Sequence, residues 1–484
     1  MKGERTKPVN RPRGSRREFL KQCALGAAAL AAPWSRPAPA AGGSGASRGP
    51  NFVFLLVDDL GWSHVECFGN TFHETPNIDR LASGGMRFTS AYAASAVCSP
   101  TRASIQTGKY PARLGITDWI PGERHRKKPL VTRFTETELP LGETTIAEAL
   151  KAKGYATAFI GKWHLGRREF YPQHQGFDVN VAGNHKGHPH NGYFSPYNLE
   201  HLDDGPKGEY LTDRLTDEAV GLLDAFGRER QNPFMLFLSY YTVHTPIQSR
   251  TDDREYYGKK MARDPDRHWK NPAYAGMVRA LDRSVGRILD RLDALAMSEE
   301  TVVFFMSDNG GVDYADVSTN HPLRGGKGRY YEGGIREPMI VRWPGVTDPR
   351  SVCHVPVIST DFYPTMLEMA GIPPDPDQHK DGLSLVPLLR GEKSLGREAL
   401  FWHYPHYHGS GATPCSAIRF GDHKLIRYYE DGKKELFDLA ADRAEERDLA
   451  DEEPALVIDL ERRLDAWLKE TGAYIPVPRT GESR

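Results

Sequence analysis

The chain is organised around Val97-Cys98-Ser99-Pro100-Thr101-Arg102-Ala103-Ser104-Ile105-Gln106-Thr107-Gly108. This stretch predicts a cysteine at a chain bend, followed by a helix whose first turn contains Pro100, because a proline there sacrifices no hydrogen bond. Arg102 follows Cys98 by four residues, so one helical turn brings its guanidinium back towards the thiol. A helix N-terminus and a cation both favour an anion beside Cys98. The alternative is a buried structural cysteine near a turn.

Four apolar segments have the length of buried strands, and polar residues follow each of them. The segments cover residues 51–57, 155–161, 233–239 and 301–306, with helical patterns over 144–153, 211–226 and 277–295. The polar residues that follow are Asp58 and Asp59, Lys162 and His164, His244, and Asp308 and Asn309. In alternating α/β proteins the ligand crevice lies at the carboxyl edge of the sheet. We therefore predict an α/β fold with a large mixed, mostly parallel sheet flanked by helices and one polar site at its edge.

Four of these residues offer oxygen ligands to a metal ion. Asp58 and Asp59 follow a buried strand, where adjacent carboxylates are costly unless a cation compensates them. Together with Asp308 and Asn309 they form a set that suits Ca²⁺, with Mg²⁺ as the alternative, rather than zinc. A solvated pair of carboxylates at a strand end is the other reading of Asp58 and Asp59.

The pattern Cys98-x-Pro100-x-Arg102 resembles the signature of the type I sulfatases of the alkaline phosphatase superfamily. The resemblance implies that Cys98 is oxidised to formylglycine, whose hydrated aldehyde attacks sulfur. Gln106 departs from the extended signature, which usually has an apolar residue there. The run from Gly154 to His164 resembles the second signature of the same family.

The resemblance also implies roles for the polar residues. The catalytic set is Cys98, Arg102, Lys162, His164, His244 and Lys327, the last within Arg324-Gly325-Gly326-Lys327-Gly328, and the calcium ligands are Asp58, Asp59, Cys98, Asp308 and Asn309. Calcium and Arg102 hold the hydrated formylglycine, while Lys162, Lys327 and His244 neutralise the sulfate oxygens. Asp308 is a candidate base, and His244 or Lys327 protonates the departing alcohol. His164 then helps to expel sulfate.

Short strands at 417–420, 424–428 and 435–439, with turns between them, follow residue 391, and a final helix covers 454–469. This region resembles the small C-terminal antiparallel domain of sulfatases. We therefore expect an α/β catalytic domain over 50–390 and a small α+β domain, an antiparallel sheet plus helix, over 391–484.

The first forty residues predict an export signal. Arg16-Arg17 precedes an alanine-rich apolar run, and Ala38-Pro39-Ala40 is a small-residue cleavage site. The signal is of the twin-arginine type, which exports folded proteins, so we expect a periplasmic or secreted protein that uses the twin-arginine export machinery. A formylglycine-generating enzyme then has to act in the cytoplasm. Residues 41–49 are a flexible lead, and no further segment predicts a transmembrane helix.

The charge argues against a nucleic-acid-binding protein, and the cysteine content argues against a disulfide-rich one. Residues 1–40 carry a net charge of +7 and the whole chain −1, which leaves −8 for the remainder and opposes nucleic-acid binding. The four remaining cysteines, Cys67, Cys98, Cys353 and Cys415, are too few for a disulfide framework.

Two histidine clusters share the spacing H-x-x-H-x-H. They are His185, His188 and His190 in one loop, and His403, His406 and His408 in another. We expect them at the rim of the site, where imidazoles contact a sugar. A zinc site and solvated loops are the alternatives.

We therefore expect a sulfatase that hydrolyses sulfate esters, with sulfated carbohydrate as the substrate. A phosphate- or phosphonate-ester hydrolase of the same superfamily is the alternative enzyme. A non-catalytic sulfated-glycan-binding protein is the alternative if Cys98 is never oxidised.

Overall fold

The computed structural model of the protein describes residues 49–122, 127–132, 134–263 and 268–479. The predicted signal at 1–40 lies outside these residues, as do the lead at 41–49 apart from Gly49 and the last five residues of the chain. No helix among the described residues is long and apolar enough to cross a membrane.

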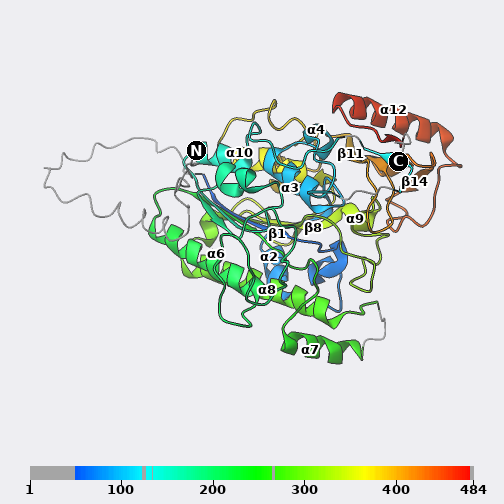
Figure 1. The fold of residues 1–484 in the computed structure, drawn as a ribbon. Helices are drawn as coiled ribbons and strands as arrows, with labels where there is room; N and C mark the ends of the chain where they lie inside the picture. The colour runs from blue at the N-terminus through cyan, green and yellow to red at the C-terminus, as the bar shows by residue number, and fades with distance from the viewer. Residues whose placement is uncertain (1–48, 123–126, 133, 264–267, 480–484) are drawn as a thin grey trace, which may run out of the picture.

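A nine-stranded sheet forms the centre of the molecule (Figure 1). Its order is β10-β2-β8-β7-β1-β6-β4-β5, and β9 pairs with β2. The strands are β1 (Asn51–Val57), β2 (Met86–Tyr92), β4 (Ala156–Gly161), β5 (Val179–Val181), β6 (Phe234–Ser239), β7 (Thr301–Ser307), β8 (Arg336–Arg342), β9 (Ser351–Cys353) and β10 (Val357–Ile358). Only β8 runs antiparallel to its neighbours, β2 and β7. The predicted mixed, mostly parallel sheet is confirmed.

Strand β1 is buried throughout because alternate side chains enter two different cores. Val53 and Leu55 pack with helices α2, α6 and α8 on one face, whereas Phe52 and Phe54 pack with α3, α5 and α10 on the other. Figure 1 shows α6 and α8 on the opposite side of the sheet from α3 and α10. The helices are α2 (Pro76–Ser83), α3 (Cys98–Thr107), α4 (Pro111–Leu114), α5 (Ile146–Ala152), α6 (Leu211–Arg228), α7 (Thr251–Met261), α8 (Pro272–Ala294), α9 (Glu332–Ile335), α10 (Phe362–Met369), α11 (Val386–Leu389) and α12 (Pro454–Glu470).

Local signals explain where the helices begin. Helix α5 begins after Thr145, whose side chain and that of Glu148 form a reciprocal capping box. Helix α8 begins five residues before the predicted start at residue 277, because the Asn271 side chain accepts two backbone N–H groups and Pro272 occupies the first turn. Helix α3 begins at Cys98 itself, so Pro100 is its third residue.

A four-stranded antiparallel sheet follows near the C-terminus, in the order β11-β12-β13-β14. Its strands are β11 (Ala399–Tyr404), β12 (Cys415–Phe420), β13 (His423–Tyr428) and β14 (Lys434–Asp438). Strand β11 is absent from the sequence-based expectation. The sheet shares a core with helix α12 and with residues Tyr92, Val97 and Tyr330 of the preceding part of the chain. A two-stranded ladder of β3 (Leu130–Val131) and β15 (Val477–Pro478) ties the end of the chain to an earlier loop.

Buried charges also join this small sheet to the larger one. The Lys424 ammonium on β13 contacts Glu332 Oε1 at 2.8 Å and Glu445 Oε1 at 2.6 Å, and all three side chains are buried. Arg324 Nη1 donates to the backbone carbonyl of Glu445 at 2.9 Å. Because Arg324 lies three residues before Lys327, the small sheet supports the loop that carries this lysine.

Candidate active site

The four strands that end in polar residues are neighbours in space. Strands β7, β1, β6 and β4 are adjacent and parallel, so their carboxyl ends meet at one edge of the sheet. The residues after them, together with the start of helix α3 and the loop at Lys327, form a single cluster. All six predicted catalytic residues belong to it.

Two lysine–aspartate pairs lie at the centre of the cluster. Lys162 Nζ donates to both oxygens of Asp58 at 2.9 and 2.8 Å, and both side chains are fully buried. Lys327 Nζ lies 2.7 and 2.8 Å from the two oxygens of Asp59. Burial raises the pKa of Asp58 to about 8 against the attraction of Lys162. Burial also acts to raise the pKa of Asp59, but Lys327 and His244 outweigh it and hold that pKa below its usual range.

Arg102 lies beneath these pairs and connects three strand ends. Its Nε donates to Asp308 Oδ2 at 2.9 Å, and its Nη2 lies 2.7 Å from the same oxygen. Its Nη1 donates to the carbonyl of Lys162 at 2.7 Å and to Ser239 Oγ at 2.6 Å. The Arg102 side chain is 3% exposed, so it lies below the open part of the site and holds the strand ends together.

The Cys98 thiol occupies the N-terminus of α3 and is 3% exposed. Burial acts to raise its pKa, but the ammonium groups of Lys162 and Lys327 outweigh burial and lower it to about 6. The two ammonium groups therefore favour a negative charge at position 98.

Two histidines lie beside the cysteine, and their pKa values are shifted in opposite directions. Burial and Lys327 act to lower the pKa of His244, but the carboxylates of Asp59 and Asp58 raise it above its ordinary value. Burial and Lys162 hold the pKa of His164 well below its ordinary value. The Nε2 of His164 bonds to the carbonyl of Ile120, which leaves its buried Nδ1 as an acceptor with no partner among the described residues. The site thus pairs a proton donor with a proton acceptor.

The donor atoms at this edge can hold a metal ion. Among the described residues, one atom each of Asp58, Asp59, Cys98 and His244 lie within 4.8 Å of one another. Asn309 Nδ2 donates to Asp59 Oδ1 at 2.8 Å, while its own Oδ1 is buried without a partner in the described chain. That orphaned oxygen beside two carboxylates fits a hard cation such as Ca²⁺. Asp308 lies outside the group of four, and Arg102 engages its carboxylate.

The first histidine cluster reaches the site through one member. The His188 ring stacks on His244 with centroids 5.8 Å apart, and the His190 ring lies 4.2 Å from His188. His185 instead bonds through Nδ1 to the hydroxyl of Tyr171 at 2.7 Å.

The prediction that His403 lies in a loop at the rim of the site is wrong. His403 lies on strand β11, is 4% exposed and bonds to Ser416 Oγ and the carbonyl of Tyr474. Strand β11 is at the edge of the small sheet, and His403 is buried by Ser416 on the paired strand β12, by the ring of Tyr429 and by the backbone at Tyr474. His406 bonds to Thr117 Oγ1 at 2.8 Å. His408 lies against the Lys327 loop, since a Cβ added to Gly328 would come within 2.1 Å of its Nδ1.

Sequence reasoning missed several residues that position the site. Ser239 accepts from Arg102 and donates to the carbonyl of Lys162, and its place at the end of β6 was a usable signal. Ser99 Oγ donates to the carbonyl of His164 at 2.9 Å. Asn320 Nδ2 donates at 2.9 Å to the carbonyls of Gly311 and Gly325. Asn320 thereby joins the loop after Asn309 to the loop before Lys327, and no motif marks it.

The neutral imidazole of His64 supports the loop between Asn309 and Lys327. Its Nδ1 faces the Tyr274 hydroxyl at 2.6 Å and accepts the N–H of Gly61 at 3.0 Å, while Nε2 lies 2.9 Å from the carbonyl of Thr319. A carbonyl cannot donate, so Nε2 carries the proton and Nδ1 is the acceptor. Burial lowers the pKa of His64 to about 4.

This histidine is expected to make the fold acid-sensitive. Between pH 6.5 and 4 the unfolded chain binds a proton at His64 that the folded chain does not, so the free energy of unfolding falls as the pH falls. A His64→Gln variant is expected to be less stable at pH 7 but to lose less stability between pH 7 and 5 than the unsubstituted protein. Urea unfolding of both proteins at the two pH values measures the difference. Equal losses in the two proteins would contradict the assignment.

Comparison with known protein families covers most of the chain. The family model described as "Sulfatase" matches residues 50–372, and the model described as "N-sulphoglucosamine sulphohydrolase, C-terminal" matches residues 326–471. A protein named "Sulfatase" from Formosa agariphila is 33% identical, over 88% of this chain and 90% of its own length. Arylsulfatase A from Homo sapiens is 33% identical, over 90% of this chain and 85% of its own length.

A solved structure agrees with these sequence matches. It is Ps i-CgsB in complex with k-i-k-neocarrahexaose, which superposes with a TM-score of 0.75 at 30% sequence identity. The superposition covers 87% of this chain and 93% of that chain.

Proposed function

The chain belongs to the sulfatase family of sulfuric ester hydrolases, and on that premise we propose that it removes sulfate from sulfated carbohydrate with a nucleophile made from Cys98. The observation that carries the proposal is the position of this thiol among Lys162, Lys327 and His244, at the edge where Asp58 and Asp59 meet. The oligosaccharide held by the structural relative Ps i-CgsB supports a carbohydrate substrate.

The cationic side chains explain how a sulfate ester is bound. Lys162 and Lys327 each hold a buried carboxylate in this structure, and both face the thiol closely enough to lower its pKa. Sulfate oxygens that approach Cys98 therefore meet two ammonium groups in a site of low dielectric constant, where charge pairing is strong. The formylglycine implied by the family supplies the nucleophilic oxygen at position 98.

The two histidines divide the proton transfers between them. His244 donates through Nδ1 to the Thr245 carbonyl at 2.8 Å, so Nε2 carries a proton only in the imidazolium form. The raised pKa of His244 favours that form, whose Nε2 proton can pass to the departing alcohol oxygen. His164 stays neutral and presents a bare Nδ1, which can accept the proton released when sulfate leaves. His188 stacks on His244 and is the histidine of its cluster that we assign to the substrate side.

Asp58, Asp59 and Asn309 would hold the metal ion, with Asp308 and position 98 as the further ligands that the family implies. When bound, the ion supplies positive charge that stabilises negative charge developing at sulfur. The buried carboxylates and the orphaned Asn309 oxygen favour calcium over a softer metal.

Removal of the ion is expected to reduce both activity and stability. Without it the buried Asp59 carboxylate, whose pKa lies below its usual range, loses a compensating charge, so EGTA treatment should lower the thermal unfolding temperature and sulfate release together. Added Ca²⁺ is expected to restore both, and elemental analysis of the purified protein should find about one calcium per chain. Full activity of metal-free protein would contradict the assignment.

The reaction class is tested by rates on aryl sulfate and aryl phosphate, together with the intact mass of the peptide that contains Cys98. A sulfatase releases sulfate much faster than phosphate, and oxidation of the thiol to an aldehyde lowers the peptide mass. A faster phosphate reaction would instead indicate the phosphate- or phosphonate-ester hydrolase. An unmodified thiol in inactive protein would favour the non-catalytic glycan-binding alternative.

We also infer export through the twin-arginine machinery to the periplasm or the medium, supported by Arg16 and Arg17 and the apolar run that follows. Because the Cys98 thiol is 3% exposed after folding, a cytoplasmic formylglycine-generating enzyme has to act before the chain folds. Fractionation of cells that produce an Arg16→Lys, Arg17→Lys double variant tests the route. Undiminished export of this variant would contradict it.

A further inference from the structure

The loop between Asn309 and Lys327 is held firmly against the site. The Lys327 N–H donates to the carbonyl of Gly311 at 3.1 Å, and Asn320 bridges the carbonyls of Gly311 and Gly325. Arg329 Nη1 donates to Asp313 Oδ2 at 3.0 Å. Side chains that project from residues 312–318 therefore have fixed positions beside Lys327.

Tyr314 is the aromatic residue of this loop. The Ser318 N–H bonds to the carbonyl of Val312 at 3.1 Å and closes a short loop that contains Tyr314. The side chain is 38% exposed, and no described residue hydrogen-bonds its hydroxyl. Burial raises the pKa of this phenol, and Lys327 opposes that rise. The loop that carries Tyr314 is hydrogen-bonded to Lys327 through Gly311 and to Arg329 through Asp313.

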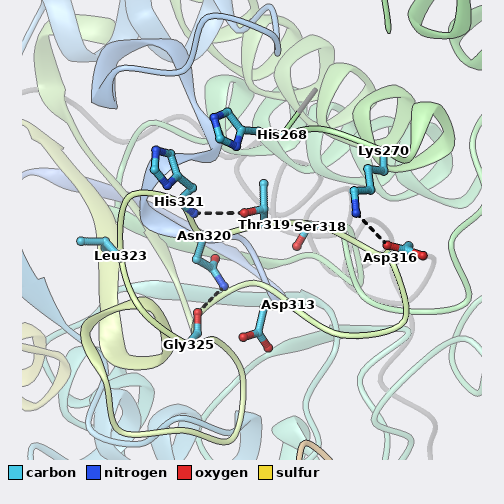
Figure 2. Close-up of a pocket in the computed structure, with 10 residues that line it drawn as sticks. All are labelled: His268, Lys270, Asp313, Asp316, Ser318, Thr319, Asn320, His321, Leu323 and Gly325. Atoms are coloured by element: carbon cyan, nitrogen blue, oxygen red, sulfur yellow. Dashed lines mark hydrogen bonds and ion pairs between the residues drawn. The ribbon is translucent and has the colours of Figure 1, made fainter. Parts of the chain in front are cut away.

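A polar cavity of about 480 Å³ is lined by residues of the same loop, among them Asp313 and Asp316 (Figure 2). His268 and His321 stack at one end with ring centroids 4.5 Å apart, while Asp313 and Gly325 lie at the opposite end. Asp313 Oδ1 is buried and has no hydrogen-bond partner among the described residues. The volume falls within the range of about 300–1,000 Å³ that is usual for small-molecule pockets.

We propose that Tyr314 and this cavity bind the sugar part of the substrate: Tyr314 stacks on the ring that carries the sulfate, and the cavity holds an adjoining, uncharged sugar. The inference rests on the proposed function and names the residues that would bind the leaving group, which is the sugar released when the sulfate ester is cleaved. A tyrosine ring offers an apolar face to the C–H groups of a sugar and a hydroxyl to its oxygens.

The charges of the cavity explain why the second sugar is uncharged. Asp313 already pairs with Arg329, and its free oxygen can accept a sugar hydroxyl without further neutralisation. Asp316 also lines the cavity, and its Oδ1 lies 3.5 Å from Lys270 Nζ. Arg329 and Lys270 each already pair with a carboxylate, so neither cation is left over for a second sulfate, and a neutral hydroxyl-bearing ring is preferred over an anionic one.

The experiment compares the native enzyme with Tyr314→Ala, Tyr314→Phe and His321→Ala. The substrates are a monosulfated monosaccharide, a disaccharide that adds a neutral sugar, and a disaccharide whose second sugar is also sulfated. Inorganic sulfate, as a competitive inhibitor, reports on the sulfate-binding groups alone. Tyr256→Ala is the control, because Tyr256 is 41% exposed and lies on helix α7, none of whose residues lines the cavity.

We expect Tyr314→Ala to raise KM for both monosulfated sugars by about 3–10-fold, while Tyr314→Phe retains most of the affinity. His321→Ala should raise KM for the neutral disaccharide but not for the monosaccharide. The inhibition constant of inorganic sulfate should be unchanged in all variants, and the native enzyme should prefer the neutral disaccharide to the disulfated one.

An unchanged KM in Tyr314→Ala would overturn the stacking role. An inhibition constant for sulfate that rises in parallel with KM would also overturn it, because the substitution would then have disturbed the sulfate site. A preference for the disulfated disaccharide would overturn the neutral-sugar assignment. Native enzyme that releases no sulfate from any of the three substrates would contradict the proposed function itself.

Discussion

Replacing Cys98 with alanine is expected to lower sulfate release by at least about 10⁴-fold, because the substitution removes the atom from which the nucleophile is made. Cys98→Ser should be nearly as inactive, since this sequence is of the cysteine type and a hydroxyl at this position is not converted. Release of sulfate from aryl sulfate, measured at enzyme concentrations high enough to detect residual turnover, tests both variants.

The same substitution is expected to leave the fold intact. The thiol is buried among charged groups rather than in an apolar core, so a methyl group in its place leaves no large cavity. Cys353→Ala is the matched control, because Cys353 is also buried but belongs to the core on the α3 face of the sheet. Retained turnover in Cys98→Ala, with normal turnover in the control, would contradict the proposed chemistry.

Arg102→Met is expected to have the largest effect on stability. It leaves the Asp308 carboxylate, which is fully buried, without its cation, and it removes two hydrogen bonds to the carbonyl of Lys162 and to Ser239. Breaking a buried ion pair in this way costs about 3–5 kcal/mol. Arg102→Lys should restore little, because an ammonium cannot reproduce the fork of contacts. Urea unfolding followed by fluorescence measures the loss.

A matched control separates this effect from the simple loss of an arginine. Arg167 has a side chain that is 77% exposed and pairs with Glu138, so Arg167→Met should change the free energy of unfolding by less than about 1 kcal/mol. An Arg102→Met variant as stable as Arg167→Met would show that the buried network does not hold the strand ends together.

The strands that carry the site could be predicted because their sequences are simple. Buried parallel strands are continuous apolar runs, so the ends of β1, β4 and β7 are visible as abrupt changes to charged residues, whereas His244 follows the end of β6 by five residues. Strand β2 alternates Arg87 and Thr89 with apolar residues and sits between longer elements, so its pattern is weaker. Strand β11 contains His403, whose residue type suggested a binding role although its neighbours bury it.

The remaining site residues could not be predicted, because their roles depend on contacts between distant segments. Asn320 acts by bridging two backbone carbonyls, and neither its residue type nor its spacing in the sequence predicts such a bridge. Tyr314 gains its position from the hydrogen bonds that hold its loop to Lys327. The stacking of His188 on His244 likewise depends on how two loops pack, whereas the spacing of the histidines in sequence is shared by a cluster that is partly buried elsewhere.

The attachment of Arg324 and Lys424 to Glu445 bears on how this molecule can be divided. A chain that stopped near residue 390 would keep every strand that leads into the catalytic cluster, yet it would lack the partners of Arg324 and would uncover Tyr92, Val97 and Tyr330. The part of the chain before residue 390 and the small C-terminal sheet are therefore not independent of each other. A chimera that exchanges the C-terminal sheet between relatives would inherit a working lysine loop only if the donor supplied a matching carboxylate and backbone turn at the position of Glu445.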